Sequence, residues 1–243
     1  MTIDSKIRKL LDSITEKLKD FFKGNFKCLI LYGSWAKGIA REDSDIDLLA
    51  VFKKVDGNTS KLLYEMETDA EGEKSITIVP TTIEDFIKEK ITLYTAVKKE
   101  GKIIWGDVDL TINPEPPHIK YAEASKKSKE FEIKKVEMAE EILKDHPTYG
   151  AVDLCFIASK HAIQMALAIK GIGYSSKVAV LLPMAEKHLG KEIAETFKKL
   201  FDLYVKSEYG IESLTEEESK LAVEYAKKMI EVYDFKSFNN KGK

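Results

Sequence analysis

Arginine is nearly absent from this chain of 243 residues: Arg8 and Arg41 are the only two, and lysine supplies the remaining positive charge. A basic surplus is absent too, because 39 lysines and arginines stand against 41 aspartates and glutamates. This balance argues against a general nucleic-acid-binding surface. Cysteine is also scarce, and Cys28 and Cys155 lie far apart in apolar contexts. We therefore expect buried, reduced thiols rather than a disulfide or a metal site.

The sequence shows no signal peptide at Met1 and no apolar run of transmembrane length. We accordingly predict no membrane association and a cytoplasmic location. With 44% hydrophobic residues the composition is normal for a globular protein, and the length suffices for two modest domains.

Short apolar runs bounded by turn residues alternate with helical patterns in the first half of the chain. The patterns predict a helix over Ile3–Phe22, a helix that begins after Thr82 as its N-cap, and a helix over Leu93–Lys99. The acidic stretch Glu67–Lys74 predicts a loop. Strands are predicted over Lys27–Tyr32, Ile46–Phe52, Ser75–Pro80 and Gly101–Gly106.

Three prolines, Pro114, Pro116 and Pro117, divide the chain, because neither a helix nor a central strand passes through such a cluster. Strand signals end there, and only helical patterns follow. We predict an α/β domain over residues 1–112 and a helical bundle over residues 118–243. The predicted helices of the bundle are Tyr121–Lys144, Ala151–Lys170, Val178–His188, Ile193–Lys206 and Glu216–Val232.

Two aspartates stand one residue apart in the stretch "LYGSWAKGIAREDSDIDLLAVF", Leu31–Phe52. Side chains alternate between the faces of a strand, so Asp45 and Asp47 point the same way. Two like charges on one face repel each other and require a positive partner. A divalent cation such as Mg²⁺ suits carboxylate oxygens, and Lys37 or Arg41 is the alternative counter-charge.

A glycine-serine turn precedes the aspartates. Gly33 and Ser34 end the first predicted strand, and backbone N–H groups in such a turn, together with the serine hydroxyl, can hold a phosphate. Gly38 allows the chain to double back and bring the aspartates beside the turn. Phosphate donors that face metal-binding carboxylates are the equipment of phosphoryl or nucleotidyl transfer. An ordinary turn followed by solvated aspartates is the plain alternative, which the joint pattern disfavours.

The pattern Gly-Ser-x(3)-Gly-x(5)-Ser-Asp-Ile-Asp-Leu resembles the signature of minimal nucleotidyltransferases in the DNA polymerase beta superfamily, and the resemblance extends over Phe26–Gly106. It implies an α+β fold with a small mixed sheet and flanking helices. It also implies transfer of a nucleoside monophosphate from an NTP, most simply ATP, to an acceptor hydroxyl. The nucleotide-binding residues would be Gly33, Ser34, Lys37 and Ser44, and the catalytic, Mg²⁺-binding residues would be Asp45 and Asp47.

One departure from this family concerns a third carboxylate, which the family normally supplies from a following strand as a metal ligand or as a base. The matching position falls near Thr77, and Glu73, just before that strand, is the candidate substitute. The departure motivates a second hypothesis, a non-catalytic nucleotide-binding or toxin–antitoxin-like regulatory module. The two-domain layout alone suggests a third, antibiotic modification.

The helical half resembles HEPN domains over Tyr121–Tyr233, as an up-and-down bundle that pairs with such nucleotidyltransferases. Many HEPN domains are ribonucleases that use an arginine followed by a histidine, but this half contains no arginine. We therefore predict no ribonuclease activity and interpret His161 as a bundle histidine. The bundle would bind the acceptor, which is a small molecule, a protein or RNA, or would form a homodimer.

Overall fold

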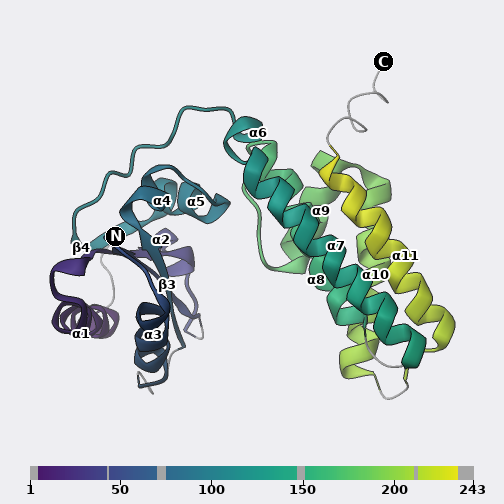
Figure 1. The fold of residues 1–243 in the computed structure, drawn as a ribbon, viewed down its shortest axis with the longest axis horizontal. Coiled ribbons are helices and arrows are strands. Elements are labelled where there is room, and N and C mark those ends of the chain that lie inside the picture. The colour runs from purple at the N-terminus through teal and green to yellow at the C-terminus, as the bar shows by residue number, and fades with distance from the viewer. Residues whose placement is uncertain (1–4, 43, 70–74, 147–150, 211–212, 235–243) are drawn as a thin grey trace. The chain divides into compact units, whose positions relative to one another are not determined.

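The computed structural model describes residues 5–42, 44–69, 75–146, 151–210 and 213–234. Contacts divide the chain into two units, Met1–Pro114 and Glu115–Lys243, each of which we describe by itself (Figure 1). The first unit contains the sheet and its helices, and the second contains helices alone among its described residues. The α+β fold class expected from the sequence is therefore confirmed.

The sheet is mixed and has the strand order β3-β2-β1-β4. Strand β1, Phe26–Tyr32, lies in the centre and pairs antiparallel with β2, Ile46–Phe52, and with β4, Lys102–Gly106. Strand β3, Ile76–Thr82, pairs parallel with β2. All four strands were predicted from their apolar runs, with ends within two residues.

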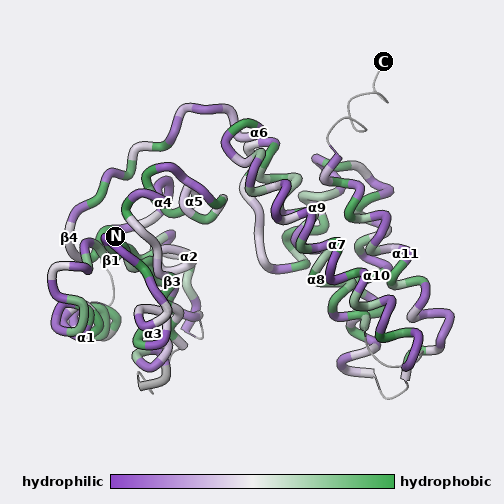
Figure 2. The backbone as a smooth tube through the Cα atoms, viewed as in Figure 1, coloured by the Kyte–Doolittle hydropathy of each residue, from purple (hydrophilic) through white to green (hydrophobic). Residues whose placement is uncertain are grey.

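Alternation along the strands creates two apolar faces. Helices α1, Ser5–Phe22, and α3, Gly57–Asp69, pack on the face that includes Leu48 and Phe52. Helices α4, Ile83–Ile87, and α5, Thr92–Glu100, pack on the opposite face, together with Ile30, Leu49 and Val51. In Figure 2, α1 accordingly carries both hydrophobic and hydrophilic residues around its turns. Asp45 and Asp47 therefore belong to the face that α4 and α5 cover.

Helix α3 was not predicted. Its first residues, Gly57 to Ser60, are poor helix formers, so no helical pattern was identified there. Asp56 compensates locally, because its Oδ1 accepts the backbone N–H of Thr59 at 2.8 Å. Leu63 and Met66 are then buried against the sheet. Of the expected loop Glu67–Lys74, the first three residues end α3 and residues 70–74 lie outside the described part.

As far as the structure describes it, the second unit consists of the short helix α6, five longer α-helices and a final 3-10 helix, Glu231–Tyr233, and the five longer helices were all predicted. Helix α8 is central and packs against α7, α9, α10 and α11. Thr215 begins α11 with a capping box that Glu218 completes. The helices are α6, Pro117–Lys120; α7, Ala122–Asp145; α8, Val152–Ile169; α9, Val178–Leu189; α10, Lys191–Tyr209; and α11, Glu216–Ile230.

Helix α8 corrects the expectation that no segment is long and apolar enough to cross a membrane. Its 18 residues have a mean hydropathy of 1.4, which meets that condition by length and composition. However, 61% of this segment is buried inside the protein. The central position of α8 in the bundle accounts for its apolar character, because a helix that is packed on several sides is hydrophobic nearly all round.

The thiols and the bundle histidine match their sequence interpretations. Cys28 and Cys155 are free and buried, and burial raises the pKa of each thiol to about 12. Nδ1 of His161 lies 3.0 Å from Oε1 of the buried Glu132, whose Oε2 accepts from Nζ of Lys135 at 2.6 Å. His161 is thus held by a partner within the bundle.

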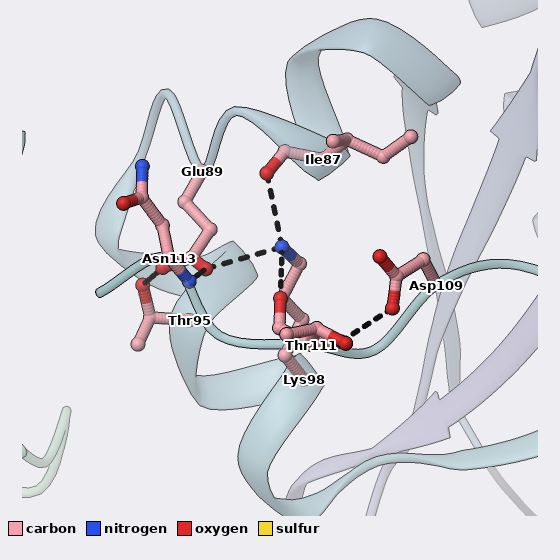
Figure 3. A network of polar contacts seen from close by, with 7 residues as sticks. All are labelled: Ile87, Glu89, Thr95, Lys98, Asp109, Thr111 and Asn113. Carbon is pink, nitrogen blue, oxygen red and sulfur yellow. Dashed lines mark hydrogen bonds and ion pairs between the residues drawn. The ribbon is translucent and has the colours of Figure 1, made fainter. Parts of the chain in front are cut away.

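A buried ion pair fastens the last part of the first unit (Figure 3). The side chains of Lys98 and Glu89 are 2% and 0% exposed, and Nζ of Lys98 lies 3.1 Å from Oε1 of Glu89. The same ammonium group donates to the carbonyl oxygens of Ile87, at 3.0 Å, and Thr111, at 2.8 Å. Glu89 Oε1 also accepts the backbone N–H of Asn113. The pair therefore ties the segment after β4 to the connection between α4 and α5.

Removing one partner of this pair should destabilise the first unit strongly. Lys98→Met leaves the Glu89 carboxylate buried without its cation, which costs about 3–5 kcal/mol of unfolding free energy. Both tryptophans of the chain, Trp35 and Trp105, belong to the first unit, so their fluorescence during urea unfolding reports this unit. Lys99→Met, at the next, exposed position, is the control. A loss no larger than that of the control would contradict the prediction.

Candidate functional site

The site begins at a turn between β1 and the short helix α2, Gly33–Lys37. Gly33 has φ of +70°, a conformation that favours glycine, and it directly follows the last residue of β1. Gly38 ends α2 with φ of +73°, and the backbone N–H of Ile39 donates to the carbonyl of Ser34 at 3.1 Å. The chain thereby turns back toward β2, as the positions of the two glycines predicted.

The Gly33 backbone and the Asp47 carboxylate lie against each other. A Cβ added to Gly33 would collide with Oδ2 of Asp47 and lie 3.1 Å from its Cγ. The register agrees, because Tyr32 and Asp47 are partners across β1 and β2. Burial and the charge of Asp47 together raise the pKa of the Tyr32 hydroxyl to about 12. The glycine turn and the second aspartate of the motif therefore form one local site.

Asp45 and Asp47 interact electrostatically. Asp45 is exposed just before β2, whereas Asp47 is partly buried within the strand. Burial raises the pKa of the Asp47 carboxyl, and the neighbouring charge of Asp45 raises it further. Within the described part of the chain, neither carboxylate forms an ion pair with a lysine or arginine. The oxygens of two neighbouring carboxylates are the ligands that a hard divalent cation prefers.

The raised pKa of Asp47 has a consequence for stability. The folded protein holds this proton to a higher pH than the unfolded chain, whose carboxyl titrates near 3.8. The contribution of Asp47 to stability therefore becomes less favourable as the pH rises from that value through the raised pKa, and the deficit persists at neutral pH. A cation bound between the two carboxylates would offset this deficit.

Lys37 is directed to another partner. Its Nζ lies 2.6 Å from Oε2 of Glu100, the last residue of α5. The sequence offered Lys37 or Arg41 as counter-charges for the aspartates, and the structure pairs neither of them with Asp45 or Asp47 among the described residues. Glu100 itself was not singled out from the sequence, because no local pattern connects it to the motif.

Ser44 shapes the loop before the aspartates. Its Oγ accepts the backbone N–H of Arg41 at 2.8 Å, and its carbonyl accepts Nε1–H of Trp35 at 3.1 Å. Trp35 also packs against the core cluster that α1 and α3 cover. The indole therefore fixes the peptide directly before Asp45. The sequence pattern did not reveal this role, because any residue is allowed at the position of Trp35.

Thr77 occupies the position beside the aspartates on β3. It is the register partner of Asp47 in the parallel β2–β3 pair, so the two side chains share a face, and Thr77 is exposed. Glu73, the candidate third carboxylate, lies outside the described residues. Within the described ranges there is no group of three or more histidine, cysteine, aspartate or glutamate side chains placed to hold a metal ion.

Solved structures share this architecture at low sequence identity. The spectinomycin adenyltransferase AAD(9) from Enterococcus faecialis, solved with ATP and spectinomycin, is 15% identical with a TM-score of 0.54, over 94% of this chain and 100% of that one. A nucleotidyltransferase-like protein from Exiguobacterium sibiricum is 12% identical with a TM-score of 0.42, over 96% of this chain and 81% of that one.

A chain from the tri-AMPylated HEPN toxin of Shewanella oneidensis in complex with MNT antitoxin is 17% identical with a TM-score of 0.29. The match covers 41% of this chain and 73% of that one. No curated protein matches the sequence. At these identities, only the likeness to the adenyltransferase carries weight, and it concerns the fold.

Family models match both halves of the sequence. The model described as "Polymerase beta, Nucleotidyltransferase" matches residues 16–110, which include the glycine turn, both aspartates and all four strands. The model described as "HEPN domain" matches residues 133–236, which include most of the bundle. The chain therefore contains a segment that matches the polymerase beta nucleotidyltransferases, followed by a segment that matches HEPN domains.

Proposed function

We propose that the protein binds ATP or another NTP with Mg²⁺ and transfers a nucleoside monophosphate to an acceptor hydroxyl. The observation that carries this proposal is the close approach of the Gly33 backbone to the carboxylate of Asp47. This contact puts a glycine turn, which can accommodate phosphate oxygens, directly beside two carboxylates that lack a cationic partner within the described chain. The family match to the nucleotidyltransferases supports the same chemistry.

Each predicted site residue has a role in this proposal. Asp45 and Asp47 would hold Mg²⁺, which when bound neutralises charge on the phosphate oxygens. Gly33 and Ser34 would bind the triphosphate, because they begin α2 where backbone N–H groups are free of helical partners. Ser44 would act chiefly by keeping the loop before Asp45 in place. Lys37 would bind the nucleotide too.

The acceptor and its binding surface form a separate part of the proposal. We assign acceptor binding, or contact with a second copy, to the helical domain. The acceptor is a small molecule, a protein or RNA, and a cytoplasmic setting is consistent with each. ATP is the first nucleotide to test, because the fold neighbour AAD(9) was solved with it.

Thr77 favours a second candidate function. The position beside Asp47 on β3 carries a hydroxyl, which is no base at neutral pH. Such a site can bind an NTP without transferring it, as a nucleotide-binding or toxin–antitoxin-like regulatory module would. Mass spectrometry separates the two functions: a nucleoside monophosphate attached to protein, RNA or a small acceptor supports transfer, and measurable NTP binding without any adduct supports the regulatory module.

Loss of either aspartate should remove the Mg²⁺-dependent part of ATP binding. Asp45→Asn or Asp47→Asn deletes one anionic ligand of the cation. The affinity measured by isothermal titration with ATP and Mg²⁺ should therefore fall on the order of ten-fold or more. Even a residue that only hydrogen-bonds to a metal ligand contributes about that much to metal affinity. Asp12→Asn is the matched control. Asp12 is exposed on α1, and α1 packs on the sheet face opposite to that of Asp47. Equal affinities in the wild type and the site variants would discard the assignment.

A glycine substitution tests the geometry without removing a charge. Gly33→Ala forces a Cβ into the Asp47 carboxylate at a residue with positive φ, so either the carboxylate or the turn must move. We expect loss of Mg²⁺-dependent ATP binding together with a stability loss of roughly 1–2 kcal/mol. In Gly24→Ala, the control, the new Cβ meets no atom within 4 Å. Unchanged binding in Gly33→Ala would show that the contact between glycine and aspartate does not shape the site.

A further inference from the structure

The ion pair between Lys37 and Glu100 connects the glycine turn to α5. Lys37 stands in the last turn of α2, the helix that begins with Gly33 and Ser34, and its ammonium group lies 2.6 Å from Oε2 of Glu100. Helices α2 and α5 are in contact, so the pair lies between two packed elements. Both side chains remain partly exposed, at 43% for Lys37 and 37% for Glu100. The ammonium group is thus accessible to a ligand from solvent.

The position of Glu100 explains why it needs Lys37. Glu100 is the last residue of α5, where the partial negative charge of the helix C-terminus disfavours a carboxylate. A cation from α2 offsets this unfavourable interaction. Asp47 belongs to the same sheet face that α5 covers. The ammonium group of Lys37 is held by the carboxylate of Glu100.

A triphosphate would be a stronger partner than Glu100. A half-exposed ion pair is weak in water, whereas phosphate oxygens accept charge-assisted hydrogen bonds from a lysine and carry several negative charges. If Lys37 transfers from Glu100 to the phosphate, Glu100 is left at the end of its helix without its cation. In that case the ion pair is lost when the nucleotide binds, and its loss opposes binding.

We propose that Glu100 sets the nucleotide affinity of the site by competing with the triphosphate for the ammonium group of Lys37. This inference rests on the proposed function, because it takes the glycine turn as the phosphate site. It assigns a role in ligand affinity to Glu100, a residue outside the nucleotidyltransferase signature. Glu100 contacts no ligand in this role and acts only through Lys37.

The experiment is a double-mutant cycle read by isothermal titration with ATP and Mg²⁺. Glu100→Gln frees Lys37 and should lower the Kd roughly two- to five-fold, the range expected for a half-exposed ion pair. Lys37→Met should raise the Kd. When Lys37→Met is already present, adding Glu100→Gln should leave the Kd unchanged, because no ammonium group remains to be released.

Glu84→Gln is the matched control for the general effect of removing a negative charge. Glu84 is an exposed carboxylate on α4 of the same domain and pairs with Lys88, not with α2. The change in Kd for Glu100→Gln must exceed the change for Glu84→Gln. Thermal unfolding of each variant verifies folding, which is expected because the substituted side chains are all more than one-third exposed.

The outcomes separate this inference from the proposed function. If the wild type binds ATP with Mg²⁺ through Asp45 and Asp47, but Glu100→Gln leaves the Kd unchanged or raises it, the competition is overturned and the function stands. If Glu100→Gln tightens binding equally with and without Lys37, the effect does not pass through Lys37 and the competition is again overturned. If the wild type binds no nucleotide at all, both proposals fail together.

Discussion

The site depends on one constraint: two carboxylates of like charge are held on the same side of β2, one of them against the backbone of Gly33. Burial, with repulsion from Asp45 added to it, raises the pKa of Asp47. The described part of the chain supplies no ion pair that relieves this repulsion. The fold therefore maintains an unfavourable arrangement, and perturbed carboxylates of this kind cluster at functional sites.

The rest of the first domain keeps this arrangement in place. Trp35 holds the peptide before Asp45 through the carbonyl of Ser44, and Gly33 leaves room for the carboxylate of Asp47. Helix α5 reaches both the turn and the segment that leads out of the domain, because Glu100 pairs with Lys37 and Lys98 bonds to the carbonyl of Thr111. Helix α5 thus links the glycine turn to the end of the domain through these two side-chain contacts.

Patterns of local sequence predicted the strands and the long helices, because alternation and helical spacing are properties of neighbouring residues. Strand β2 is predicted from end to end, since every residue of Ile46–Phe52 except Asp47 is apolar. Helix α3 was missed because its start lacks helix formers and depends on the cap by Asp56. The turn and the aspartates were predicted to face each other, and the register places Asp47 beside Tyr32, the residue before the turn.

The contacts between distant segments were beyond the reach of such patterns. The pairing of Lys37 with Glu100, and of Lys98 with Glu89, joins residues whose surroundings in the sequence contain many other lysines and glutamates. Only the packing of α2 and α5 on the sheet selects these partners. For the same reason, the sequence presented Lys37 as a counter-charge for the aspartates and gave no sign of Glu100.

The most direct measurement is a crystal structure of the wild-type protein with Mg²⁺ and a non-hydrolysable ATP analogue. The account predicts one cation bound by carboxylate oxygens of both Asp45 and Asp47, at about 2.0–2.1 Å, with the triphosphate on the turn of Gly33 and Ser34. A nucleotide bound elsewhere on the protein would contradict it, as would a nucleotide on the turn with no cation between the two aspartates.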